Sequence, residues 1–375
     1  MKFRIACDDL SPMLGRLQGF LLNKENSLSS VLANVLLLVT ETGELQLSAT
    51  NLQITFHGII DVKDQEPGSI TVDGKRLNAM VKQLPAEVVE FQTEGEEMLH
   101  LRSGRSTMAL LATDAREFPE LPSTEGLEFY TVQGSVLAKL LERTLFSSST
   151  DEARPNLNGI LFTGRGDSIL RAVSTDGYRL TVAEREAGAE GSNIPEFEGQ
   201  IIPRKGAIEL AKLVEPYPEV ELAINGQNLV VKSSDFTVHI RLLAEMYPPY
   251  EDVIPKSNDL IFNLDRQRFL NALKRMNLIG EERLHRVTLD FQGGELLLES
   301  SNANLGKVEE HIELQEGSSD AELQVAFSAV YMMDILNVIK GDKVQICLSA
   351  AGKVPAIFKD PSWEQDTFVV MPLRS

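Results

Sequence analysis

The stretch FNLDRQRFLNALKRM, residues 262–276, decides the fold because its pattern occurs twice more in the chain. FRIACDDLSPMLGRL occupies residues 3–17, and YTVQGSVLAKLLERT occupies residues 130–144. Each copy begins with the apolar alternation of a short strand and continues with apolar residues three and four apart, as in a helix with one buried face. Because internal repeats define architecture before any single motif does, we expect one domain plan used three times.

A second helix and several strands complete each copy. Apolar spacing predicts helices over residues 8–23, 73–84, 133–146, 204–214, 264–279 and 328–340. Alternating runs with glycine-bearing turns predict β-hairpins between the two helices of each copy. The segments FPELPSTEGLE and YPPYEDVIPKSND carry the prolines and acids of linkers. The expected class is α+β, with three tandem domains over residues 1–125, 126–257 and 258–375.

Charge is unevenly distributed along this acidic chain of 375 residues and net charge −19. The six helical windows contain fourteen basic and seven acidic residues, so the remainder is strongly acidic. Helices that cover one face of a sheet and carry base outward would form a basic surface suited to a nucleic-acid duplex. Ordinary solvated helix faces explain the pattern equally well at this point. Three units in a row also leave both end surfaces unpaired, and a closed ring of two chains would cap both.

Sequence motifs give no support for an enzyme. The five histidines are scattered singly, and neither a phosphate-binding glycine loop nor a nucleophile elbow occurs, so we expect no metal, no cofactor and no catalytic residues. Acidic pairs such as Glu309 and Glu310 leave a metal-assisted nuclease or hydrolase as an alternative, and a passive β-rich scaffold as another. GRGDS at residues 164–168 predicts a hairpin turn.

The compartment is predicted from cysteine usage and from apolar length. Cys7 and Cys347 lie in predicted strands and read as two buried free thiols of a reducing compartment. No apolar stretch is long enough to span a bilayer, and the amino terminus has no signal-peptide pattern. We therefore expect a cytoplasmic protein that does not contact the membrane.

The threefold pattern is broken at one turn. The three copies read ATNLQI (residues 49–54), STDGYRL (174–180) and SSNANL (300–305). Only the middle copy has Gly177 followed by Tyr178 and Arg179, a combination of backbone freedom and amphipathic side chains typical of binding sites. A type I′ turn with an exposed tyrosine is the simpler interpretation.

Six further segments connect the chain with a known family: PRKGAIEL (203–210), NLNGILF (156–162), STDGYRL (174–180), RSGRS (102–106), EFPELP (117–122) and VVMPLRS (369–375). In this order, around a triplicated plan, the sequence resembles the bacterial DNA polymerase III beta sliding clamps over its whole length. The resemblance implies a non-catalytic processivity factor of DNA replication, a head-to-tail homodimeric ring that encircles double-stranded DNA without regard to sequence. Its helices would line the hole and its sheets would lie outside. Implied partners are the replicative DNA polymerase catalytic subunit, a clamp-loader subunit and other clamp-binding replication and repair proteins.

The resemblance also implies three groups of site residues. The expected partner-peptide cleft, between the second and third domains, consists of Leu157, Thr175, Gly177, Tyr178, Arg179, Leu180, Pro248, Val253, Val369 and Met371. A shallower subsite would contain Arg154, Tyr331, Val354, Pro372, Leu373 and Arg374. DNA-binding candidates are Lys24, Lys75, Arg76, Lys82, Lys139, Arg143, Arg204, Lys205, Arg268, Lys274 and Arg275, with Arg154 as a further loop candidate. The dimer interface would pair Met108 and Leu110 of one chain with Leu278 and Ile279 of the other. Tyr178 and Asn156 depart from the family pattern, which has histidine and an aromatic residue there.

Overall fold

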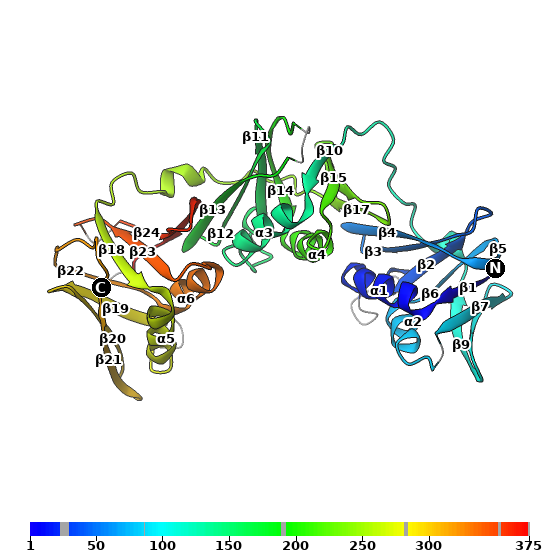
Figure 1. The fold of residues 1–375 in the computed structure, drawn as a ribbon, viewed down its shortest axis with the longest axis horizontal. Helices are drawn as coiled ribbons and strands as arrows, with labels where there is room; N and C mark the ends of the chain where they lie inside the picture. The colour runs from blue at the N-terminus through cyan, green and yellow to red at the C-terminus, as the bar shows by residue number, and fades with distance from the viewer. Residues whose placement is uncertain (23–29, 86, 189–192, 281–283, 352–353, 374–375) are drawn as a thin grey trace. The chain divides into compact units, whose positions relative to one another are not determined.

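The computed structural model describes all residues except 23–29, 86, 189–192, 281–283, 352–353 and 374–375 (Figure 1). The six predicted helices are present within the described residues and are slightly shorter than predicted: α1 (Cys7–Leu17), α2 (Gly74–Val81), α3 (Gly134–Leu145), α4 (Arg204–Val214), α5 (Arg266–Asn277) and α6 (Ala329–Val338). Cys7 is the first residue of α1, so its predicted place in a strand was wrong. None of the described helices is long and apolar enough to cross a membrane.

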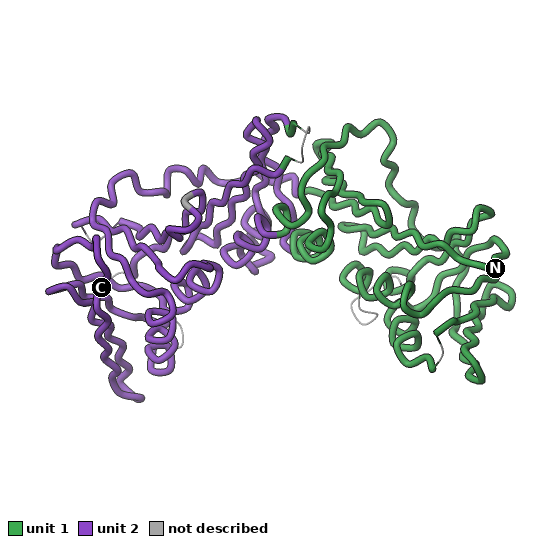
Figure 2. The backbone as a smooth tube through the Cα atoms, viewed as in Figure 1, with its two compact units in different colours: residues 1–138, 188–194, 205–242 green, residues 139–187, 195–204, 243–375 purple. Residues whose placement is uncertain are grey.

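The chain forms two compact units (Figure 2). Unit 1 contains residues 1–138, 188–194 and 205–242, and unit 2 contains residues 139–187, 195–204 and 243–375. The middle copy of the repeat is divided between the units, because some of its strands extend a sheet of the first copy and others extend a sheet of the third.

Unit 1 is built on one sheet of thirteen strands. Its order is β10 (Tyr130–Gln133), β15 (Glu219–Ile224), β16 (Asn228–Lys232), β17 (Phe236–Arg241), β4 (Ile54–Asp61), β3 (Glu44–Thr50), β2 (Asn34–Val39), β6 (Gly68–Asp73), β9 (Ser106–Thr113), β8 (Met98–Ser103), β7 (Val88–Glu94), β1 (Lys2–Ala6) and β5 (Lys63–Glu66). The seam between the first and second copies is the antiparallel pair β4 and β17, in which Ile54 faces Ile240.

Unit 2 contains two sheets. The larger one has the order β14 (Glu196–Pro203), β11 (Gly159–Arg165), β12 (Ile169–Thr175), β13 (Arg179–Glu186), β25 (Trp363–Val370), β24 (Ala356–Asp360), β23 (Lys343–Leu348) and β18 (Leu260–Asp265). The smaller one has the order β21 (Gly306–Glu313), β20 (Glu295–Asn302), β19 (Arg286–Gln292) and β22 (Leu323–Ser328). The seam between the second and third copies is the antiparallel pair β13 and β25, in which Arg179 faces Val370.

The helices pack on the sheets through the apolar faces that the sequence predicts. In α5, Phe269, Leu270, Leu273 and Met276 are buried in one core with α6 and both sheets of unit 2. The Asp265 side chain caps α5 by accepting a 2.7 Å hydrogen bond from the amide of Arg268. Burial of these apolar side chains leaves the polar face of the helix, with its lysines and arginines, away from the sheets.

The GRGDS segment is a hairpin turn, as predicted. It connects β11 to β12, and Gly166, Asp167 and Ser168 all have positive φ values there. The turn is therefore fixed by local backbone geometry rather than by a ligand.

Candidate partner-binding cleft

The turn between β12 and β13 is tied together by its own side chains. The Thr175 hydroxyl donates to the carbonyl of Arg179 over 2.6 Å and accepts from the amide of Gly177 over 3.1 Å. The Asp176 carboxylate accepts from the amides of Tyr178 and Arg179 at 2.9 and 3.1 Å. Gly177 has φ +91°, a left-handed backbone that favours glycine. The turn therefore presents Tyr178 and Arg179 from a rigid base.

The first and second copies are joined through the same turn. Thr50 bonds the carbonyl of Ile54 and the amide of Leu52 at 3.2 and 3.0 Å, as Thr175 does for Arg179 and Gly177. Leu52, at φ +72°, occupies the place of Gly177. The two seams are therefore built alike, and what differs is the chemistry of the side chains around the turn.

An apolar cavity of about 270 Å³ opens beside the second turn, and we call it the apolar cavity. Nine of the ten residues predicted for the cleft line it, all except Tyr178. Pro249 and Tyr250 also line the apolar cavity and were not predicted. The sequence signal for them was the run of two prolines and a tyrosine after Tyr247, which we interpreted only as a linker.

The carboxyl-terminal segment is held in place as far as the structure describes it. The amide of Leu373 donates to the carbonyl of Ala326 over 2.8 Å, and β25 ends at Val370, just before Met371 and Pro372. Hydrogen bonds on both sides of Pro372 fix Met371 at the wall of the apolar cavity. A frayed apolar terminus does not fit these contacts.

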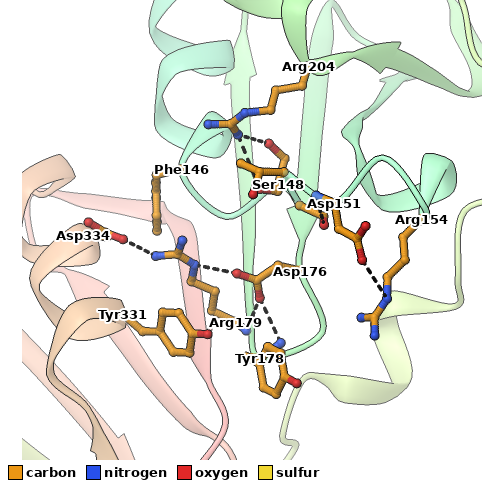
Figure 3. Close-up of a pocket in the computed structure, with 12 residues that line it drawn as sticks. Phe146, Ser148, Asp151, Arg154, Asp176, Tyr178, Arg179, Arg204, Tyr331 and Asp334 are labelled. Carbon is orange, nitrogen blue, oxygen red and sulfur yellow. Dashed lines mark hydrogen bonds and ion pairs between the residues drawn. The ribbon is translucent and has the colours of Figure 1, made fainter. Parts of the chain in front are cut away.

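A second cavity of about 550 Å³, which we call the polar cavity, lies on the other side of Arg179 (Figure 3). Arg154, Tyr178 and Tyr331 line it, together with Asp151, Asp176, Asp334 and Arg204. Of the other subsite residues, Val354, Pro372 and Leu373 line neither cavity, and Arg374 lies outside the described residues.

Arg179 is the one side chain that both cavities share with full ionic support. Its guanidinium binds Asp176 at 3.0 Å and also binds Asp334 on α6. It stacks over the rings of Tyr331 and Phe146, 4.7 and 5.3 Å from their centroids. Tyr178 stacks on Tyr331 with ring centroids 6.1 Å apart. Burial raises the pKa of Tyr331, so this phenol remains a neutral hydrogen-bonding group at neutral pH.

Seven of the predicted DNA-binding side chains are exposed on or beside the helices: Lys75, Arg76, Lys82, Lys139, Lys205, Arg268 and Lys274. Arg275 is exposed as well but is bound by Glu310 at 2.8 Å. Lys24 lies outside the described residues. These positions leave a set of cations that can meet a phosphate backbone without breaking a buried contact.

Arg143 and Arg204 are corrections to the predicted DNA surface. The Arg143 side chain is buried and binds Asp366 at 2.6 Å, beside Arg185, which binds the same carboxylate at 2.6 Å. Both guanidiniums stack on Trp363. Arg204 turns back to the end of α3, where its Nη1 donates to the carbonyl of Leu145. These long side chains leave the helix face on which the sequence pattern places them, because acceptors from distant elements bind them.

The predicted dimer residues differ in exposure. Leu278, just after α5, is 76% exposed, whereas Ile279 and Met108 are half-buried. Leu110 is 5% exposed and its neighbour Leu111 is 78% exposed, because alternate residues of β9 face opposite sides of the sheet. The exposed apolar side chain of β9 is therefore Leu111 and not Leu110.

Chemistry at these sites is that of binding. Within the described ranges, no three His, Cys, Asp or Glu side chains lie close enough together to hold a metal ion. A triplicated sheet-and-helix plan with exposed cations on its helices and an apolar cleft at a seam defines the class of three-domain DNA clamps.

Comparison with known proteins agrees with this class. Residues 1–122, 131–249 and 251–374 match the N-terminal, central and C-terminal domains of the DNA polymerase III beta subunit. The beta sliding clamp of Pseudomonas putida is 31% identical over 347 residues, 92% of each chain, and that of Escherichia coli K12 is 30% identical over the full length of both. The crystal structure of the DNA polymerase III subunit beta from Pseudomonas aeruginosa covers both chains fully with TM-score 0.91 and 29% identity.

The chain belongs to the DNA polymerase III beta subunit family. Its function is that of a DNA sliding clamp, a non-catalytic processivity factor of replication.

Proposed function

We propose that two copies of this chain close head to tail around duplex DNA in the cytoplasm and hold partner proteins through the apolar cavity. The single observation that carries this proposal is that one seam design occurs twice within the chain and leaves a third pair of strand edges open. In both seams a strand of one copy extends the sheet of the next, β4 with β17 and β13 with β25. The corresponding strands that remain are β21 of the third copy and β9 of the first.

Both remaining strands have an edge available for pairing. β21 is the outermost strand of its sheet, and β9 pairs with β6 only at Thr113 and Ala112 among the described residues. Strand ladders give the expected register. Lys307 stands opposite Ser301, as Thr55 stands opposite Thr50 and Leu180 opposite Thr175. Transfer of the two internal seams then places Lys307 opposite Ala109 of the partner copy, and Glu309 opposite Thr107.

Charge on the two edges is complementary. β21 carries Glu309, Glu310 and Glu313, while the β8–β9 hairpin carries exposed Arg102 and Arg105. Leu278 and Leu111 supply exposed apolar area, alongside half-buried Met108 and Ile279. Apolar contact supported by opposite charge favours pairing of unlike edges over pairing of like edges. We expect Leu111 to take the place that the sequence pattern gave to Leu110.

Basic side chains on the helices would keep the duplex centred through its phosphates, without reading base sequence. Topological linkage removes the need for tight contact, since nonspecific dissociation constants are typically about 10⁻⁴ to 10⁻⁶ M at physiological salt. A partner bound to the ring then gains an effective concentration of roughly millimolar at its DNA substrate. Partners of this kind are the replicative polymerase catalytic subunit, a clamp-loader subunit and repair proteins that present a short peptide with aliphatic and aromatic residues.

Retention on DNA tests this function. The protein is loaded on a nicked circular plasmid by a clamp loader, and bound and free protein are separated by gel filtration in high salt. Protein that remains on the circle and is released after linearisation by a restriction enzyme supports a ring. Equal loss from circular and linear DNA would contradict it.

A further inference from the structure

One arginine of the polar cavity has no carboxylate partner. Arg154 lies 3.8 Å from Asp151, and Arg179 binds both Asp176 and Asp334. Arg204 makes no ion pair with any described carboxylate, and all its side-chain hydrogen bonds use Nη1, which donates to Leu145 and Ser148. Its Nε and Nη2 therefore have no acceptor among the residues that the structure describes, although the side chain borders a cavity of about 550 Å³.

The surroundings of Arg204 favour an added negative charge. The side chain is half-buried, and its pKa is lowered because burial disfavours the charged form and because the Arg179 guanidinium repels it. A carboxylate placed against Nε and Nη2 would relieve both effects and would accept two hydrogen bonds from a planar donor pair.

The polar cavity is next to the apolar cavity, because Arg179 lines both. A peptide whose apolar residues occupy the apolar cavity would pass Arg179 and Tyr178 within a few residues. Asp151, Asp176 and Asp334 also line the polar cavity, so a strand of several phosphates would meet three carboxylates there. A single carboxylate beside Arg204 avoids that repulsion.

We infer that the polar cavity binds the side-chain carboxylate of an acidic residue in the same clamp-binding peptide that fills the apolar cavity. This inference rests on the proposed partner cleft and adds one chemical requirement to it. Arg204 and Arg154 supply the positive charge, and Arg179 separates the acidic residue from the apolar anchors.

A peptide exchange measures this requirement directly. Fluorescein-labelled peptides with one set of apolar anchors carry Glu or Gln at each of the three positions on either side of the anchors, and fluorescence polarisation gives their dissociation constants with the full chain. At one position the Glu peptide should bind about five- to tenfold more tightly than the Gln peptide, as expected for a charge-assisted hydrogen-bonded pair. Arg204→Met should reduce that ratio to about one and leave the Gln peptide within about twofold of its original affinity.

Arg266→Met is the matched control. Arg266 also caps a helix end, donating to the carbonyl oxygens of Leu336 and Gly341 at 2.9 and 2.7 Å, but it does not line the polar cavity. It should cost thermal stability as Arg204→Met does, without changing the Glu to Gln ratio. If Arg204→Met fails to fold, Arg204→Lys and the salt dependence of the ratio serve the same purpose, since only the Glu peptide should weaken with salt.

Three outcomes would overturn the inference. A ratio near one at every position removes the acidic requirement while the Gln peptide still tests the apolar cavity. An unchanged ratio in folded Arg204→Met assigns the preference elsewhere. Competition of a single-stranded oligonucleotide with the Glu peptide, lost in Arg204→Met, would assign the site to a nucleic-acid phosphate. Absence of binding by every peptide would contradict the partner cleft itself.

Discussion

The backbone amide of Met371 donates a 2.9 Å hydrogen bond to the carbonyl oxygen of Tyr178. This bond joins the end of the third copy to the turn of the second and holds the Met371 side chain at the wall of the apolar cavity. The equivalent bond at the other seam runs from Arg241 to Gln53 over 2.8 Å. Arginine there replaces the flexible apolar side chain that a peptide pocket uses.

Removal of residues 371–375 should therefore abolish peptide binding without unfolding the protein. The deletion ends the chain just after β25, so the sheet remains complete. A labelled polymerase-tail peptide should bind at least tenfold more weakly by fluorescence polarisation, because Met371 and its backbone bond are both lost. Unchanged affinity in a folded truncated dimer would show that the cleft lies elsewhere.

A cysteine pair tests the register of the proposed third seam. Ala109→Cys combined with Lys307→Cys should give a covalent dimer on mild oxidation, because directly opposite residues of antiparallel strands have suitable Cα distances for a disulfide. Leu111→Cys with Lys307→Cys is the control, two residues out of register, and should crosslink poorly. Nonreducing gels report the result, and equal crosslinking of both pairs would reject the register.

Loss of apolar area should open the dimer. Leu278→Asp with Ile279→Asp places two charges at the exposed apolar end of α5, and light scattering should then report the mass of one chain. Leu111→Asp should act in the same direction, whereas Leu284→Asp, at an exposed leucine outside the proposed interface, should keep the dimer mass. A dimer mass for all three variants would exclude this surface as the interface.

His239 should make the protein sensitive to acid. Burial, and then the charge of His57, lower the pKa of His239 to about 4. Because the unfolded chain binds a proton near its ordinary pKa of about 6.5, the free energy of unfolding falls as pH drops from about 6.5 towards 4. At pH 5 the loss should be about 2 kcal/mol. His239→Gln should reduce the difference in melting temperature between pH 7.5 and pH 5, whereas His100→Gln, on exposed β8, should not.

Arg143 and Lys139 occupy neighbouring turns of α3 and should behave oppositely. Arg143→Met leaves the Asp366 and Asp360 carboxylates buried with one cation fewer, so it should cost about 3 kcal/mol or more. Lys139→Met should change stability by about 0.5 kcal/mol or less. It should instead lower the salt dependence of DNA binding by about 0.9 per lost phosphate contact. Thermal melts and a salt titration separate the two effects, and a reduced salt dependence in folded Arg143→Met would return this residue to the DNA surface.

Helices and hairpins were predictable because local spacing encodes them. In α5, four buried side chains repeat at helical intervals, and no distant contact is needed to recognise them. Most of the apolar cavity followed from the resemblance, since Leu157, Pro248 and Met371 come from segments that composition alone does not bring together.

The sequence could not show which charges are already bound. Arg143 and Lys139 both look like exposed helix cations, but a carboxylate 223 residues away binds the first. Leu110 and Leu111 are likewise adjacent leucines, and only the register of β9 decides which one is buried. Long-range pairing supplies this information, and periodicity does not contain it.

The repeated strand-edge seam has a consequence for assembly. A contact between unlike ends closes into a pair only if the two internal seams together turn each chain through half a revolution. A substitution that changes the angle at β4–β17 or β13–β25, and leaves β9 and β21 untouched, would not stop association. It would redirect the chains into open filaments, which would appear as concentration-dependent fibres in electron micrographs instead of free monomer.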